Sequence, residues 1–199
     1  MTIELSSPSA NTYTVAGKSV PRVTTVLNTL YDFSGVPQDQ LAFAADRGRM
    51  VHLATQYIDE GDFNFDYLDA QLKPYIDAYQ QFLEDVRPQW SGIERLVHSE
   101  KYGYAGQLDR VGVLCGLKGE PEAIVDIKAV VKLSPITALQ TAAYEMADRV
   151  EHRESARARY ALQLKKDGTY KLQKYDDPTD FSVFLSALSL HNWRTRNGL

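Results

Sequence analysis

Apolar and polar residues alternate along two neighbouring stretches in the middle of the chain, at 104–114 and 123–128. A period of two with many β-branched and aromatic residues is typical of strands. The segment 116–121 between them is rich in glycine and contains a proline, so the two stretches predict a β-hairpin with a long loop. Three further strands are expected, at 92–100, 156–164 and 170–175.

Helical spacing of apolar residues occupies most of the remaining chain. Helices are expected at 24–30, 38–46, 49–59, 67–86, 135–149 and from Asp177 onwards. Gly48 should separate the second helix from the third, and Pro74 either begins or kinks the fourth. The third helix carries a stripe that should face the core, formed by Met50, Leu53, Ala54 and Tyr57. The predicted fold class is therefore α/β, with a mixed central sheet flanked by helices.

Length and composition fit one globular domain. The 199 residues are 44% hydrophobic and 24% charged, which is enough apolar material for one buried core. Within the domain we distinguish a hairpin appendage at 1–22, centred on Gly17, a helical segment at 23–91 and a core at 92–199. The appendage is interpreted as an edge element without a function of its own.

The charge and the cysteine content exclude several classes of protein. A net charge of −4 argues against a protein that coats nucleic acid by bulk electrostatics, so any such contact requires a local basic lining. Cys115 is the single cysteine, which excludes an intramolecular disulfide and a four-cysteine iron–sulfur cluster. No apolar run is long enough to span a bilayer and the first residues lack a signal-peptide pattern, so we expect a cytoplasmic protein without a membrane partner.

Two acidic residues interrupt the apolar pattern of the central hairpin, Asp109 on its first arm and Asp126 on its second. Neighbouring strands lie about 4.8 Å apart, so a register that pairs these residues would bring two carboxylates together. A hard divalent cation with oxygen ligands would relieve their repulsion. Lys128 shares the face of Asp126 because side chains alternate along a strand, and there it could orient or help deprotonate an attacking water.

Further motifs surround these acids in a fixed order. The three core motifs are G-x-x-D (Gly106, Asp109), D-x-K (Asp126, Lys128) and Q-x-x-x-Y (Gln140, Tyr144). Upstream lie V-P-R-V-T-T-V-L at 20–27 and R-G-R-M-V-H at 47–52. Together these five elements resemble the PD-(D/E)xK nuclease superfamily and, within it, RecB-like exonucleases of the phage and mitochondrial single-strand type. The resemblance covers residues 20–175.

This resemblance implies a restriction-endonuclease-like αβββαβ core and Mg²⁺-dependent hydrolysis of DNA phosphodiester bonds, with Mn²⁺ as a substitute ion. It implies four metal ligands: His52, Asp109, Asp126 and the backbone carbonyl of Ile127. Lys128 would act on the attacking water. Ala129 departs from the family, which commonly has threonine or serine after the lysine, so a hydroxyl is missing from the surroundings of the site.

Substrate contacts are expected from polar residues around this centre. Gln140 and Tyr144 lie one turn apart on a helix and would hold a phosphate or a base. Glu94 and Glu100 both fall where many relatives have an additional acid, and Glu100 is favoured because it is nearer to the G-x-x-D turn. Lys132 could touch a phosphate. The second hairpin is the most basic part of the chain and could guide a strand, through Arg153, Arg157, Arg159, Lys165, Lys166, Lys171 and Lys174. The alternative for each of these residues is a solvated or structural role.

The resemblance also implies a biological setting. The protein would be an exonuclease of DNA recombination, repair or genome processing, with DNA that has a free end as its partner, together with a recombination or single-strand-binding protein. A phage-encoded protein acting in a bacterial host fits this interpretation. Two alternatives stay open: a structure-specific endonuclease on the same fold, and a DNA- or protein-binding module that has lost turnover.

Overall fold

The computed structural model describes residues 3–5, 12–32, 34–152 and 156–199. Its strands are β1 (Ile3–Leu5), β2 (Thr12–Val15), β3 (Lys18–Pro21), β4 (Pro88–Ser99), β5 (Tyr104–Leu114), β6 (Glu122–Lys128), β7 (Ala158–Leu164) and β8 (Tyr170–Tyr175). Its helices are α1 (Val23–Asn28), α2 (Gln38–Glu60), α3 (Lys73–Val86), α4 (Ile136–His152) and α5 (Asp180–Arg196), with a 3₁₀ turn η1 (Phe65–Tyr67).

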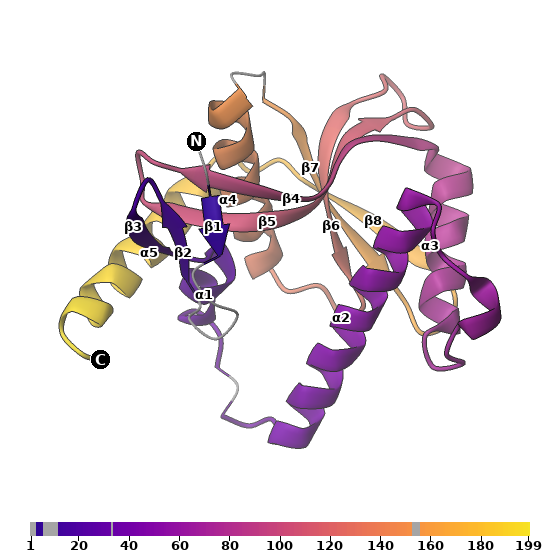
Figure 1. Ribbon diagram of the computed structural model, residues 1–199, viewed down its shortest axis with the longest axis horizontal. Helices are drawn as coiled ribbons and strands as arrows, with labels where there is room; N and C mark the ends of the chain where they lie inside the picture. Colours follow the sequence, from indigo (N-terminus) through magenta and orange to yellow (C-terminus); the bar gives the residue numbers. More distant parts are fainter. Residues whose placement is uncertain (1–2, 6–11, 33, 153–155) are drawn as a thin grey trace.

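A five-stranded mixed sheet in the order β4-β5-β6-β7-β8 forms the centre of the molecule (Figure 1). The pairs β4–β5, β5–β6 and β7–β8 are antiparallel, whereas β6 and β7 run parallel. A parallel pair needs a long crossover, and α4 provides it. The sequence of α3, β4, β5, β6, α4 and β7 is the predicted αβββαβ order, so the α/β fold class is confirmed.

Helices cover both faces of this sheet, and each face has its own apolar core. On one face α3 packs its stripe of Tyr75, Tyr79 and Phe82 against alternate residues of β6 and β7. On the other face α1, α4 and α5 pack against the remaining residues of β5 and β6, around Tyr104, Ile124 and Phe184. The strands are thus buried on both sides, which explains their nearly continuous apolar character.

The structure corrects the predicted helix break at Gly48 and decides between the two alternatives at Pro74. α2 runs without a break across Gly48, because a single glycine inside a helix costs only about 1 kcal/mol and removes no hydrogen bond. Pro74 lies in the first turn of α3, so it begins this helix and does not kink it. The segment before it forms η1 and a loop.

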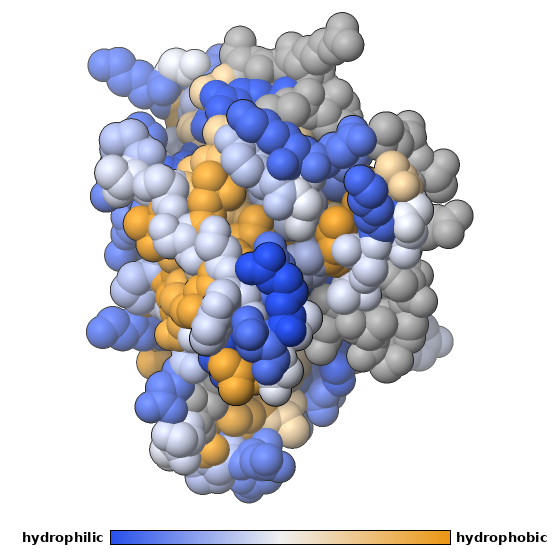
Figure 2. Space-filling model, turned by 90° about the vertical axis from the view of Figure 1, so that its left-hand side faces the viewer, coloured by the Kyte–Doolittle hydropathy of each residue, from blue (hydrophilic) through white to orange (hydrophobic). Residues whose placement is uncertain are grey.

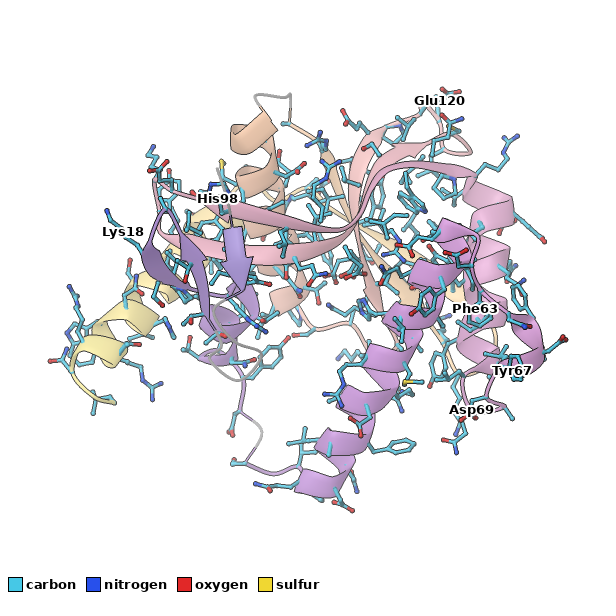
Figure 3. All side chains as sticks on the ribbon, in the orientation of Figure 1. Lys18, Phe63, Tyr67, Asp69, His98 and Glu120 are labelled. Carbon is cyan, nitrogen blue, oxygen red and sulfur yellow. The ribbon has the colours of Figure 1, made fainter. Side chains whose placement is uncertain are left out.

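The predicted core stripe of α2 is correct at Ala54 and wrong at its other three residues. Met50, Leu53 and Tyr57 are 51%, 42% and 42% exposed, and the buried residues of the helix are Val51, Ala54 and Thr55. The reason is that α2 packs against the rest of the molecule through only a narrow strip of its surface. Its exposed stripe borders a hollow shared with the η1 region, where Phe63 and Tyr67 lie (Figure 3).

The N-terminal residues form a second, small sheet. β2 and β3 make the predicted hairpin around Gly17, and β1 adds a third antiparallel strand. This sheet is packed against the central sheet, because Tyr13, Val15 and Val20 form a buried cluster with Ala105 of β5. The chain then continues through Arg22, which bridges to Ala105. The appendage is therefore part of the packed structure.

The surface is mixed in character. Figure 2 looks at the end of the molecule that carries the N-terminal sheet and α5, and apolar groups lie there in patches between hydrophilic ones. On α5, Val183, Leu190 and Trp193 are about half exposed. None of the described helices combines the length and the apolar character that crossing a membrane requires.

Candidate active site

Three potential metal ligands converge from three elements: His52 from α2, Glu94 from β4 and Asp109 from β5. One ligand atom of each residue lies within 4.8 Å of those of the other two. His52 Nδ1 is 3.5 Å from Asp109 Oδ1 and 4.0 Å from Glu94 Oε1. Glu94 has a φ of 47°, in the left-handed region that a glutamate rarely adopts, in a strand with a bulge at Trp90–Gly92. At this irregular position of the backbone, the carboxylate of Glu94 points toward His52 and Asp109.

Asp109 is held by the neighbouring strand. Its Oδ2 accepts a hydrogen bond of 2.6 Å from the backbone amide of Ile127. The ladder between β5 and β6 ends at Arg110–Val125, one step before Asp109 would face Asp126. The carboxylate of Asp109 therefore accepts a hydrogen bond from β6 just beyond the point where the backbone pairing of the two strands ends.

Strict alternation along β5 does not hold at this point. The sequence pattern places Ala105, Gln107, Asp109, Val111 and Val113 on one face. Ala105 packs on the N-terminal sheet, and Gln107 and Asp109 line a cavity with Tyr13 of that sheet, as this pattern requires. Val111 does not follow the pattern, because it belongs to the same core cluster as Leu108, three residues before it. The alternation therefore shifts by one residue between Leu108 and Val111, where the ladder to β6 also ends.

Asp126 and Lys128 form an ion pair beside this cluster. Lys128 Nζ lies 2.7 Å from Asp126 Oδ2. Asp126 is only 1% exposed, and its Oδ1 has no hydrogen-bond partner among the residues that the structure describes. Burial raises the pKa of Asp126 to about 6; Lys128 opposes this rise and the charge of Asp109 adds to it. Burial alone would lower the pKa of Lys128, but the charges of Asp126 and Asp109 outweigh it and raise that pKa.

The predicted pairing of Asp109 with Asp126 is present in part. Asp109 is near enough for its charge to raise the pKa of Asp126. The compact cluster of ligand atoms nevertheless consists of His52, Glu94 and Asp109, while the carboxylate of Asp126 is directed to Lys128. The role of Asp126 as a metal ligand, like that of the Ile127 carbonyl, stays a prediction.

These side chains open into one cavity of about 300 Å³. His52, Glu94, Asp109 and Lys128 line it together with Gln140 and Tyr144 of α4. Gln140 Nε2 donates a hydrogen bond of 3.2 Å to Tyr144 Oη, so the two residues act as a pair. Burial, followed by the charge of Asp126, raises the pKa of Tyr144 well above its usual value.

Gly106 explains how Tyr144 comes so close to β5. A Cβ at position 106 would stand 2.5 Å from Cε1 of Tyr144 and 3.3 Å from Val23. Both the tyrosine ring and α1 therefore approach the strand over a missing side chain. The group that approaches Gly106 is thus the side chain of Tyr144.

Arg110 supports the cluster from behind. It is fully buried and donates to Asp59 of α2, to Glu94 Oε1 at 2.9 Å and to the carbonyl of Asp109 at 2.7 Å. Tyr79 of α3 donates to the same carboxylate of Asp59 at 2.6 Å. Arg110 thus connects Glu94 with the two helices on that face of the sheet. Strand alternation predicts that the side chain of Arg110 points away from the cavity, and this is consistent with its position behind the cluster.

Glu100 does not take part in this arrangement. It is exposed in the turn between β4 and β5, because Ser99 and Tyr104 are the last pair of their ladder. Glu94 is the acid that lies in the cavity instead. Its position follows from the register of the two strands, since Ile93 pairs with Arg110 and Arg95 with Leu108, which brings Glu94 level with Asp109.

The three lysines that were predicted to contact the substrate do not line the cavity of the candidate active site, and they lie in three different places. Lys132 lies in a groove after β6, beside Lys171 and Tyr175. Lys166 lines a different hollow with Arg47 and Tyr75. Lys165 lies at the β7–β8 turn, 3.4 Å from the hydroxyl of Thr169.

Two arginines of the second hairpin are engaged inside the protein. Arg157 is buried and pairs with Asp148 and, at 2.8 Å, with Glu122. Arg159 pairs with Asp180 at 2.9 Å. Both therefore stabilise the fold and do not form a basic surface. Arg153 lies outside the described residues.

The donor set fits a divalent cation. It offers one imidazole nitrogen and carboxylate oxygens, and beside it Asp126 has a buried oxygen without a hydrogen-bond partner in the described part of the chain. Carboxylate oxygens suit Mg²⁺, and an added imidazole also suits Mn²⁺. The residues present are thus compatible with the ion that the motifs implied.

Comparison with known proteins gives matches at the level of structure only. No family model and no curated protein matches the chain. A candidate exonuclease from Eubacterium rectale matches with 15% identity and a TM-score of 0.50, over 76% of this chain and 68% of the other. The alkaline exonuclease LHK-Exo of Laribacter hongkongensis, in a complex with dAMP, matches with 15% identity and a TM-score of 0.40, over 90% and 93%. The first match, together with the sheet topology, confirms the restriction-endonuclease-like fold that the sequence led us to expect.

Proposed function

We propose that this protein is a metal-dependent nuclease that hydrolyses phosphodiester bonds of DNA, acting as an exonuclease. One observation carries the proposal: the cluster of His52, Glu94 and Asp109 opens into the same cavity as Lys128. Acids and an imidazole can hold a metal ion, and an amine in the same hollow can contact the attacking water or the phosphate, so this set is suited to metal-dependent phosphodiester hydrolysis.

Each residue of this centre has a proposed role. His52, Glu94 and Asp109 would hold the ion, with Asp126 and the Ile127 carbonyl as further ligands. A bound Mg²⁺ or Mn²⁺ would supply a polarised phosphoryl oxygen and a water of lowered pKa. The hydrogen bond from Ile127 fixes Asp109 in place, so the cluster is preorganised on the sheet.

Lys128 would act as a hydrogen-bond donor. Its raised pKa keeps the amine protonated at neutral pH, so it is a poor general base. A protonated amine in the cavity can orient the attacking water and stabilise negative charge that develops on the phosphoryl group. Of the two roles that the sequence left open for Lys128, orientation of the water is therefore favoured.

Gln140 and Tyr144 would position the substrate. Their mutual hydrogen bond leaves the second amide hydrogen of Gln140 for a phosphate, and the ring of Tyr144 forms part of the cavity wall. A cavity of about 300 Å³ is at the small end of ligand pockets and suits one strand better than a duplex. This supports single-stranded DNA, or a frayed duplex end, as the substrate. A role in recombination or repair, beside a single-strand-binding protein, belongs to the same proposal.

The test is incubation of the purified protein with Mg²⁺ and end-labelled linear DNA. We expect progressive shortening of the strand, and no cleavage in EDTA or by the Asp126→Asn variant. Absence of cleavage by the wild-type protein across Mg²⁺ and Mn²⁺ concentrations would reject the nuclease and favour a binding module. Discrete internal fragments at early times would favour the structure-specific endonuclease.

A further inference from the structure

The N-terminal sheet contributes directly to the cavity of the candidate active site. Tyr13 and Arg22 line this cavity together with Gly106, Lys128 and Tyr144. Arg22 is fixed by its backbone bridge to Ala105, the residue before Gly106, and its Cζ lies 5.2 Å from the centre of the Tyr13 ring. Its side chain is therefore held at the cavity by the packing of two sheets.

Arg22 differs from the other cation of the cavity in its partners. Lys128 is paired with Asp126 at 2.7 Å. Among the described residues, by contrast, no carboxylate is within ion-pair distance of Arg22, and its Nε is shielded from solvent without a hydrogen-bond partner. A shielded donor without an acceptor is unfavourable. An anion in the cavity would supply the missing opposite charge, and the planar guanidinium matches the oxygens of a phosphate.

The position of Arg22 separates it from the acid cluster. Ala105 lies four residues before Asp109 on β5, which corresponds to about 13 Å of strand. A phosphate held by the acid cluster and a phosphate held by Arg22 would then be different groups of one strand. The chemistry at Asp109 does not require Arg22, but a strand bound in the cavity would lie against both residues, because both line it.

We propose that Arg22 binds a second phosphate of the DNA strand, separate from the one that is cleaved, so that the N-terminal sheet is part of the substrate site. This inference rests on the proposed nuclease function. It replaces the interpretation of residues 1–22 as an edge element without function. The ligand is a phosphodiester of a single strand, recognised by charge and shape, so the interaction has no base specificity.

The test compares Arg22→Gln with Lys18→Gln by fluorescence anisotropy, using a short labelled oligothymidylate in EDTA and again with Ca²⁺. Lys18 is a matched control because it is exposed in β3 of the same sheet and lies at its outer edge (Figure 3). We expect Arg22→Gln to weaken binding roughly tenfold and Lys18→Gln less than about twofold. The slope of log Kd against log salt should flatten by about 0.7, because one phosphate is no longer neutralised. Equal effects of the two variants would overturn the proposal.

A fold defect is distinguished from a missing phosphate interaction by Arg22→Lys, which keeps the charge but not the planar fork. If thermal denaturation shows that Arg22→Gln is unfolded, Arg22→Lys becomes the deciding variant. We then expect Arg22→Lys to bind the oligonucleotide more weakly than the wild type, and wild-type affinity would refute the interaction. In cleavage assays Arg22→Gln should raise KM with little change in kcat, because the interaction is made equally in the ground and transition states. Arg22-dependent binding without any cleavage would reject only the nuclease. Cleavage with an unchanged KM would reject only the role of Arg22.

Discussion

Asp109 uses its two carboxylate oxygens for two different partners, one of which is the backbone amide of Ile127. Oδ2 accepts from this amide at 2.6 Å, and Oδ1 faces His52 Nδ1 at 3.5 Å. The residue is thus a structural acceptor for β6 and a candidate metal ligand at once. Substitutions that keep or remove the acceptor should separate these two roles.

We predict that Asp109→Asn and Asp109→Ala both abolish cleavage but differ in stability. Asparagine keeps an oxygen for the Ile127 amide, whereas alanine leaves a buried N–H without an acceptor, which costs about 1–3 kcal/mol. Chemical denaturation should therefore show the alanine variant as the less stable one. Equal stability of the two variants would show that the Ile127 hydrogen bond contributes nothing, and near wild-type cleavage would remove Asp109 from the site.

Asp126 should make the metal-free protein less stable as the pH rises. Its pKa is raised to about 6, so the folded state binds its proton more tightly than the unfolded state does. The resulting penalty is absent below about pH 4, grows between pH 4 and 6 and is complete above pH 6, with an upper limit of ~3 kcal/mol.

The Asp126→Asn variant tests this expectation. Asparagine carries no charge at any pH, so the variant should be more stable than the wild type at pH 7 in EDTA, and the advantage should vanish near pH 4. Its gain is reduced because Lys128 loses its partner. Parallel pH–stability curves for the two proteins would contradict the raised pKa.

The local patterns of the sequence were sufficient for most of the fold. The limits of β5 were predicted as observed, because alternation and turn residues define a hairpin without information from distant parts of the chain. The crossover helix α4 follows from Ser134, Pro135 and a helical apolar stripe. The course of α2 was not predictable in this way, since Gly48 weakens a helix locally and only its packing shows that the helix continues.

The site was predictable to the extent that it lies on motifs. His52, Asp109, Lys128, Gln140 and Tyr144 do line one cavity. Two of its members depend on tertiary structure. Glu94 reaches the cavity through the register and bulge of β4, and Arg22 reaches it through packing between two sheets. Neither placement leaves a periodic signal in the sequence.

Removal of Arg110 should be strongly destabilising. The Arg110→Met variant would leave the buried carboxylate of Asp59 with Tyr79 as its remaining partner, and breaking a buried pair in this way costs about 3–5 kcal/mol. The double variant Arg110→Met with Asp59→Asn should recover part of the loss, because the buried charge of Asp59 is then removed together with its partner, while Glu94 still lacks Arg110. Denaturation midpoints measure both effects. A double variant that is no more stable than Arg110→Met alone would show that the loss of stability does not come from the broken ion pair with Asp59.

Metal binding should depend on His52 and Glu94. We expect His52→Ala and Glu94→Gln each to weaken Mn²⁺ binding by roughly tenfold or more, measured by calorimetry, because each removes one ligand of the cluster. Glu100→Gln is the matched control for Glu94→Gln, since Glu100 is exposed in a turn. Mg²⁺ and Mn²⁺ should support cleavage, whereas Ca²⁺ should bind without supporting it, being larger and less strict in geometry. Unchanged Mn²⁺ affinity of the His52→Ala variant would show that His52 is not a metal ligand and has a structural role.

The form of the DNA decides between an exonuclease and an endonuclease. With Arg157 and Arg159 engaged in internal ion pairs, the second hairpin offers fewer free cations for gripping DNA away from an end. Linear single strands should therefore be degraded, while covalently closed single-stranded circles should stay intact. If the free strand also runs along the β7–β8 turn, Lys165→Gln combined with Lys166→Gln should raise KM and flatten the salt dependence by about 0.7 for each phosphate that is no longer neutralised. A closed circle that is nicked as fast as linear DNA is cut would establish an endonuclease, because such a circle has no end to enter the cavity.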